Sequence, residues 1–185
     1  MKTSLMRAPM KGFTLVELLV VIAIIAILAA ILMPAMNAAL KKASVAQAQT
    51  EVKSIEAAMK AYLNEYSRFP HMTRTGDRTY GYGAPDTNNW DLINTLRSVS
   101  GNGNVDGTNN VRGIILLEVS ESSLGNGNFI DPWGNVYNVT CDTDFNNACV
   151  PADAASYAVT NRNVVVWSRG PDSNARTSDD VTSWK

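Results

Sequence analysis

The 185 residues include 16 Lys or Arg and 17 Asp or Glu, so the formal net charge is −1. A chain this close to neutral has no broad electrostatic attraction for nucleic acid or anionic lipid, and we expect no nucleic acid among its partners. A single histidine in the whole chain argues against a zinc site.

A basic segment without acidic residues opens the chain. Met1 to Gly12 carries Lys2, Arg7 and Lys11. Flanks of this kind stay on the cytosolic side of a membrane span. We therefore expect the amino end inside the cell and the body of the chain outside the membrane.

An apolar run follows, in which every side chain from Leu18 to Met33 is hydrophobic. Together with the residues before it, the run is long enough to cross a hydrocarbon core of about 30 Å as a helix. We expect one membrane-spanning helix over residues 13–36. Glu17 lies inside this span, where a carboxylate is costly unless it finds a partner, so we predict a functional role for it.

The sequence Gly12-Phe13-Thr14-Leu15-Val16-Glu17, between a basic leader and an unbroken apolar helix, resembles the signal of type IV prepilins. The resemblance implies that a prepilin peptidase removes residues 1–12 by cutting between Gly12 and Phe13, and that the new Phe13 amine is methylated. In a filament, Glu17 of one subunit could then meet the Phe13 ammonium of a neighbour. Such a pair fixes register, because a slipped register leaves both charges unpaired. The alternative is a plain signal anchor with a tolerated glutamate.

The helix is expected to continue to about Tyr66. Pro34 removes one backbone donor, so it should bend or loosen the helix without ending it. Residues 37–66 are predicted to be amphipathic, with Glu56 and Lys60 off the apolar stripe as a favourable i,i+4 pair. An independent coiled coil is the alternative. The stripe consists of Val45, Val52, Ile55, Met59, Tyr62 and Tyr66.

A loop-rich globular head is expected over residues 67–185. Pro70 should end the helix, because the residue before a proline avoids the helical region. In the insert from His71 to Asn128, the pattern predicts a short helix over 90–99. The apolar run 114–119 is compatible with a strand or with a buried turn of helix. His71 itself is expected at the surface.

The second half of the head is expected to supply the sheet. Asp131-Pro132-Trp133-Gly134 predicts a turn, and a strand should follow over 136–139. Two further strands are predicted over 157–159 and 164–167, joined by a turn at 160–163. Three strands laid on the apolar stripe give an α+β fold, in which a long amino-terminal helix packs on a small antiparallel β-sheet.

Two cysteines, Cys141 and Cys149, lie close together in the sequence. In an oxidising compartment we expect a disulfide that closes a short loop, worth roughly 2.5 kcal/mol on a chain-entropy basis. Two free thiols, or an incomplete metal pair, are the alternatives. The acidic run 142–146 between them lacks the glycine and the distal Glu of an EF-hand loop, so we interpret it as a solvated turn.

The carboxyl end gathers oxygen-bearing side chains in one loop. Asp172, Asp179 and Asp180 supply three carboxylates, with Ser168 and Ser173 nearby. Calcium takes about 6–8 oxygen ligands of this kind, so the loop is a candidate calcium site. A solvated acidic loop is the alternative.

The head carries a narrower resemblance. Glu65-Tyr66, Phe69-Pro70, Asp131 to Gly134 with Tyr137, and the loop from Ser168 to Trp184 resemble the major (G-type) pseudopilin of type II secretion, within the type IV pilin-like superfamily. The resemblance implies that calcium is bound by Asp172, Asp179 and Asp180, with help from Ser168 and Ser173.

This resemblance implies a structural subunit of a pseudopilus that assembles from the bacterial inner membrane, with its head in the periplasm, and drives export of folded proteins. The expected partners are copies of the chain, other pseudopilins, the prepilin peptidase and the inner-membrane assembly platform. The alternative is a type IV pilin for adhesion, motility or DNA uptake, to which the cysteine pair and the long insert point. No enzyme is expected, because the sequence has no nucleophile elbow, phosphate loop or pair of metal-ligand histidines.

Overall fold

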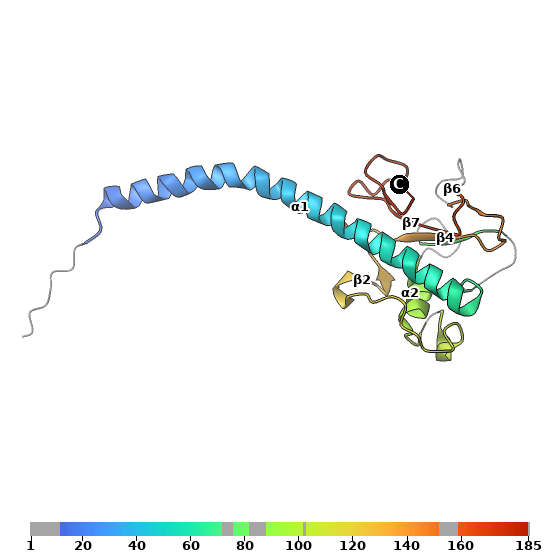
Figure 1. The fold of residues 1–185 in the computed structure, drawn as a ribbon. Helices are drawn as coiled ribbons and strands as arrows, with labels where there is room; N and C mark the ends of the chain where they lie inside the picture. The colour runs from blue at the N-terminus through green and yellow to red at the C-terminus, as the bar shows by residue number, and fades with distance from the viewer. Residues whose placement is uncertain (1–11, 72–75, 82–87, 102, 152–158, 185) are drawn as a thin grey trace, which may run out of the picture. The chain divides into compact units, whose positions relative to one another are not determined.

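The computed structural model describes residues 12–71, 76–81, 88–101, 103–151 and 159–184. It has an α+β fold, in which a long helix α1 (Leu15–Tyr66) precedes a head built on a small antiparallel sheet (Figure 1). The chain divides into two compact units, Met1–Lys42 and Ala43–Lys185.

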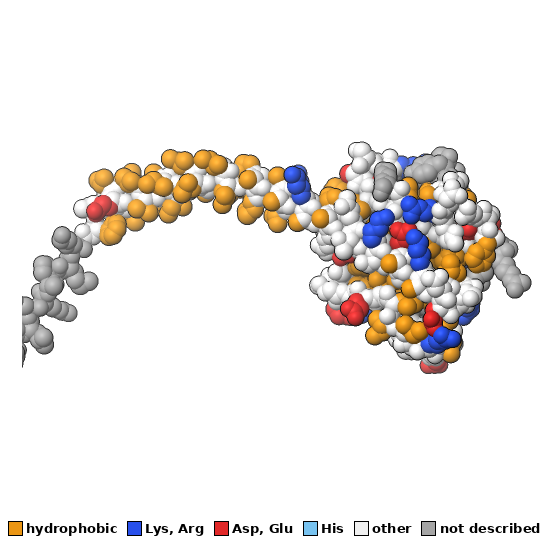
Figure 2. Space-filling model, in the orientation of Figure 1, with side chains coloured by type: hydrophobic (Ala, Val, Ile, Leu, Met, Phe, Trp, Pro, Cys, Tyr) orange, Lys and Arg blue, Asp and Glu red, His pale blue; other side chains and the backbone are white. Residues whose placement is uncertain are grey.

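The first unit contains the apolar part of α1. Its described large hydrophobic side chains, from Phe13 to Leu40, are all exposed, with exposed fractions between 46% at Val21 and 79% at Phe13. Figure 2 shows them on all visible sides of the helix, with an acidic side chain near its start. The helix continues through Pro34, as predicted. Among the described residues, α1 is the one helix long and apolar enough to cross a membrane.

The second unit begins within α1 and buries its predicted stripe. Val52, Ile55, Met59 and Tyr62 have no exposed surface, while Val45 and Tyr66 pack at the margin of the core. Ala48 and Ala58 widen the buried face, since small side chains allow close approach of the sheet. The prediction that Glu56 lies away from the buried face was wrong, because its side chain is also buried.

Helix α1 ends at Tyr66, shortly before Pro70, as the proline led us to expect. Ser67 adopts a left-handed φ of 52° and its N–H donates to the Leu63 carbonyl at 2.8 Å. Phe69 then enters the core. These contacts turn the chain away from the helix axis without extending the helix.

The insert contains a short helix, α2 (Trp90–Arg97), close to its predicted range. The 3₁₀ turns η1 (Val105–Gly107) and η2 (Glu121–Ser123) follow. Residues 114–119 form neither the strand nor the helical turn considered from sequence. Instead, the Leu96 carbonyl accepts hydrogen bonds from the N–H groups of Leu116 and Leu117, and these bonds hold this run against α2.

The main sheet has four antiparallel strands in the order β1-β4-β7-β8. The register places Tyr80 opposite Val139, Val139 opposite Val166, and Trp167 opposite Thr182. The bounds are β1 Arg78–Tyr80, β4 Asn138–Cys141, β7 Val164–Ser168 and β8 Val181–Thr182.

Two small ladders complete the described sheet structure. β2 (Leu124–Gly125) pairs with β3 (Asn128–Phe129), and β5 (Ala148–Cys149) pairs with β6 (Val159–Thr160). The last two strands predicted from sequence do not pair with each other, because β6 pairs with β5 whereas β7 pairs with β4 and β8. Tyr157, part of that predicted strand, lies outside the described residues.

The strand predicted from residue 136 begins two residues later. Val136 makes only an isolated bridge with Ile130, and Tyr137 enters the core before β4 starts. Successive residues of β7 point to opposite faces of the sheet. Val164 and Val166 join the large core with α1, whereas Val165 and Trp167 pack with Cys149 and Trp184 in a smaller cluster.

Candidate functional site

The amino end of α1 brings together the predicted cleavage residues and Glu17. Glu17 Oε2 accepts hydrogen bonds from the Thr14 N–H at 2.9 Å and from Thr14 Oγ1 at 2.7 Å. The Glu17 N–H donates in return to Thr14 Oγ1 at 3.2 Å. This reciprocal pair is a capping box, which satisfies free donors of the first helical turn. Glu17 therefore has a local partner within its own chain.

This local role was not predicted, although the spacing Thr14-x-x-Glu17 is the capping-box signature. Gly12 and Phe13 precede the cap and are exposed. Phe13, Val16, Glu17, Val20 and Val21 line one shallow apolar hollow. The carboxylate and the Phe13 side chain are therefore both accessible to a second molecule.

The Ser168 hydroxyl, which was predicted to assist the calcium loop, has partners elsewhere in the head. Ser168 is fully buried, and its Oγ donates to Asp131 Oδ2 at 2.5 Å while accepting the Gly170 N–H at 3.0 Å. Gly170 has a φ of 65°, and a Cβ there would collide with the Asp179 carbonyl. Ser168 thus joins the Asp131 turn to the end of β7.

The three loop carboxylates accept hydrogen bonds from the loop itself. Thr177 Oγ1 lies 3.4 Å from Asp172 Oδ1 and 3.1 Å from Asp180 Oδ1. Asp179 Oδ2 accepts the Asp172 N–H at 3.3 Å, and the Thr177 hydroxyl lowers the pKa of Asp179. Ser173 is exposed. The oxygens of these carboxylates are not gathered at one point, and calcium binding here stays a prediction.

A different group of carboxylates does converge. In the described part of the chain, Asp77, Asp142 and Asp144 are the one set of three or more acidic, His or Cys groups whose ligand atoms all lie within 4.8 Å of one another. Asp142 is buried and accepts the N–H groups of Asn146 and Asn147 at 3.0 and 2.8 Å. The prediction of a solvated turn was therefore wrong for Asp142.

The charges of this acidic cluster (Asp77, Asp142 and Asp144) oppose one another. Burial raises the pKa of Asp77, and the neighbouring carboxylates of Asp144 and Asp142 raise it further. Burial likewise raises the pKa of Asp142, with Asp144 adding to the effect. Asp144 is exposed, so the cluster presents negative charge at the head surface.

Cys141 and Cys149 are buried free thiols in the structure. Cys141 belongs to the large core, whereas Cys149 packs with Val165 and Trp167. Burial raises the pKa of the Cys149 thiol to about 12, and its Sγ donates to the Arg162 carbonyl at 3.2 Å. The disulfide is not formed in this structure, and the pairing stays a prediction.

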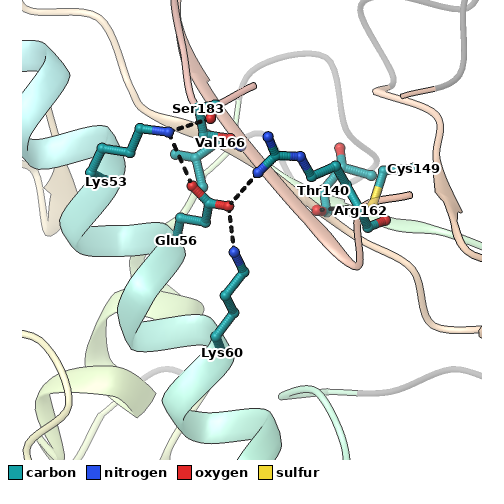
Figure 3. A network of polar contacts seen from close by, with 8 residues as sticks. All are labelled: Lys53, Glu56, Lys60, Thr140, Cys149, Arg162, Val166 and Ser183. Atoms are coloured by element: carbon teal, nitrogen blue, oxygen red, sulfur yellow. Dashed lines mark hydrogen bonds and ion pairs between the residues drawn. The ribbon is translucent and has the colours of Figure 1, made fainter. Parts of the chain in front are cut away.

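Glu56 is the centre of a charged network that the sequence did not predict (Figure 3). Its carboxylate lies 2.7 Å from Lys60 Nζ, 3.2 Å from Arg162 Nη1 and 3.6 Å from Lys53 Nζ. Lys53 also donates to the Ser183 carbonyl. Only the pair with Lys60 follows from helical spacing, because the position of Arg162 depends on the tertiary fold.

His71 is partly buried and not simply a surface residue. Its Nε2 lies 3.3 Å from Thr95 Oγ1, and its Nδ1 lies 3.4 Å from Asn109 Nδ2. Burial lowers the pKa of His71, and the charge of Arg78 lowers it further. The His71 ring therefore lies between Thr95 of α2 and Asn109 of the loop that follows.

Comparison with known proteins gives matches to pilus proteins. The model of the family described as "Prokaryotic N-terminal methylation motif" matches residues 7–33 of the chain. The type IV wide pilus major component PilA4 of Thermus thermophilus is 44% identical over 70 residues, which are 38% of this chain and 45% of the relative. Two fimbrial proteins of Pseudomonas aeruginosa are each 32% identical over 107 residues, 58% of this chain and 65% of the relative.

The chain thus spans less than two thirds of the length of these relatives. No solved structure matches it significantly. The motif and the relatives support the type IV pilin-like superfamily. They favour a pilus subunit, the alternative considered from sequence, over the type II secretion pseudopilin.

Proposed function

We propose that this chain is the structural subunit of a type IV pilus-like filament. One observation carries the proposal: a prepilin methylation motif leads without a break into the first part of α1, where the large apolar side chains from Phe13 to Leu40 are all exposed. Apolar surface of this extent needs a cover. Lipid supplies that cover before assembly, and other copies of the helix supply it afterwards. The function is structural and not enzymatic.

Processing of the amino end sets up assembly. Cleavage after Gly12 by the prepilin peptidase frees the Phe13 amine, which is then methylated and keeps its positive charge. The Thr14–Glu17 capping box holds the Glu17 carboxylate at the first turn of α1, where it remains exposed. The carboxylate can therefore accept the Phe13 ammonium of a neighbour, which neutralises both charges as the subunits leave the lipid.

The subunit is anchored in the bacterial inner membrane by a single span, with its head in the periplasm. The basic leader supports this orientation, since Lys2, Arg7 and Lys11 favour the cytosolic side. An inner-membrane assembly platform is the further expected partner. A role in adhesion, motility or DNA uptake agrees with the pilus relatives. The pseudopilin alternative depends on calcium binding by the carboxyl-terminal loop, which stays a prediction.

The mature amino terminus tests the proposal. Mass spectrometry of the protein purified from its native membrane should find a methylated Phe13 as the first residue, and electron microscopy should find surface fibres that contain the chain. A chain that retains Met1 and still functions would contradict the proposal. Loss of protein export on deletion, without loss of fibres, would favour the pseudopilin.

A further inference from the structure

The network around Glu56 has an excess of positive charge. One buried carboxylate, 4% exposed, faces three cations, so the local net charge is +2. The side chains of Lys60 and Arg162 are 50% and 37% exposed. Their charges are therefore only partly neutralised inside the head, and both reach the surface.

A groove opens beside these two cations. Its volume of about 380 Å³ is at the lower end of ligand-pocket sizes. Two cations and three side-chain amides offer donors to an anionic oxygen, and Leu63 offers an apolar wall. The groove is lined by Lys60, Leu63, Asn64, Asn161, Arg162 and Asn163.

The acidic cluster supplies a complementary surface next to the groove on the same head, because the Asp142 N–H donates to the Asn163 carbonyl at 3.0 Å and Asn147 Nδ2 donates to Asn161 Oδ1 at 3.0 Å. Its three carboxylates lie within 4.8 Å of one another, and Asp144 is its exposed member. Phe145 follows and is 53% exposed. A carboxylate beside an exposed aromatic ring matches a groove that has two cations and an apolar wall. Opposite charges placed this way give specificity and register to a contact between proteins.

We propose that the Lys60–Arg162 groove is a docking site between copies of this chain, and that it receives the Asp144 carboxylate of a second copy. The inference rests on the proposed function, because it assigns one head contact in a polymer of this subunit. Docking brings the negative cluster of one head against the positive network of the next. The contact is more sensitive to salt than the apolar contacts of the helices are.

Charge exchange tests the contact in the full-length chain. Lys60→Glu and Asp144→Lys should each lower filament yield by about tenfold, because each places like charges together. The double variant should restore the yield. Lys53→Gln is the matched control, since Lys53 contacts Glu56 but does not line the groove. Single variants that assemble normally, or a folded double variant without rescue, would overturn the proposal.

A crosslink separates this inference from the proposed function. A photo-reactive residue at position 60 of the full chain in its native membrane should give a product of twice the chain mass, joined to the 142–146 segment. The same crosslink in a chain that never forms filaments would support docking and contradict the filament function. Filaments whose position-60 crosslinks exclude that segment would overturn docking and leave the filament function standing.

Discussion

Glu56 on α1 and Arg162, just before β7, are joined by an ion pair of 3.2 Å between Oε1 and Nη1. The two residues lie 106 positions apart in the sequence, and their ion pair connects the helix to the sheet. Lys60 contacts the same oxygen at 2.7 Å. The buried carboxylate therefore links the two layers of the head through charged groups at the margin of an otherwise apolar contact.

Replacing this carboxylate should destabilise the head. In residues 43–185, which form a compact unit, Glu56→Gln should lower the free energy of unfolding by roughly 1.5–3 kcal/mol, the usual loss for hydrogen bonds to charged groups. Urea denaturation measures the effect. Glu65→Gln is the control, because Glu65 and its partner Arg112 are more exposed, and it should cost less than about 1 kcal/mol. Equal losses in the two variants would disprove a special role for Glu56.

Calcium should stabilise the same unit if the carboxyl-terminal loop binds it. At about a hundredfold excess over Kd, binding adds about 2.7 kcal/mol and should raise the melting temperature. Asp179→Asn together with Asp180→Asn should abolish the response, and Asp144→Asn should not. A response lost only with Asp144→Asn would move the site to the acidic cluster. No response in the unmodified head would end the calcium hypothesis.

Much of the fold follows from local pattern. The stripe from Val52 to Tyr62 predicts α1 because helical periodicity and burial agree over many turns. Pro70 predicts the helix end for a local steric reason. Strands β1 and β8 were missed because they are three and two residues long, and their pairing depends on distant partners.

Functional residues could be predicted only where they lie together in one contiguous segment of the sequence. The exposed Phe13 and Glu17 follow from a contiguous motif, and the Thr14 cap could have been found from its spacing. The acidic cluster could not have been predicted from the sequence, because Asp77 lies near Asp142 only through the pairing of β1 with β4. The contact of the Ser168 hydroxyl with Asp131 was not predicted, because the two residues lie 37 positions apart in the sequence.

If the head lies in the periplasm, as proposed above, the cysteine pair should be oxidised in the purified protein. Intact mass before and after reduction should differ by two hydrogens. If the protein is instead purified reduced, burial and the raised pKa of both thiols should make alkylation slow until the head unfolds. Rapid alkylation of Cys149 in the folded head would contradict the burial seen here.

His71 should make stability depend on pH. Burial lowers its pKa in the folded head, so the unfolded chain binds the proton first as the pH falls below about 6.5. The contribution of His71 is therefore present above that pH and is lost as the pH falls towards the lowered pKa. Arg68 and Arg78 also lower this pKa, whereas Asp91 raises it.

Urea midpoints of the head at about pH 7.5 and about pH 5.5 measure this dependence. His71→Gln should flatten it, because the glutamine side chain does not titrate. The Asp77 and Asp142 carboxylates remain in both proteins, so their contribution cancels in the comparison. The same slope in both proteins would show that other groups cause it.

The filament yield of Glu17→Gln is the sharpest test of charge pairing between Glu17 and the Phe13 ammonium of a neighbouring subunit. Glutamine can keep the capping box, because its amide oxygen still accepts the Thr14 N–H, but it has no charge for the Phe13 ammonium of a neighbour. Thr14→Ala is the matched control, since it weakens the cap and keeps the carboxylate. Charge pairing between Glu17 and the Phe13 of a neighbouring subunit predicts that Glu17→Gln loses filaments while Thr14→Ala forms them. Filaments of normal yield and spacing from Glu17→Gln would contradict it.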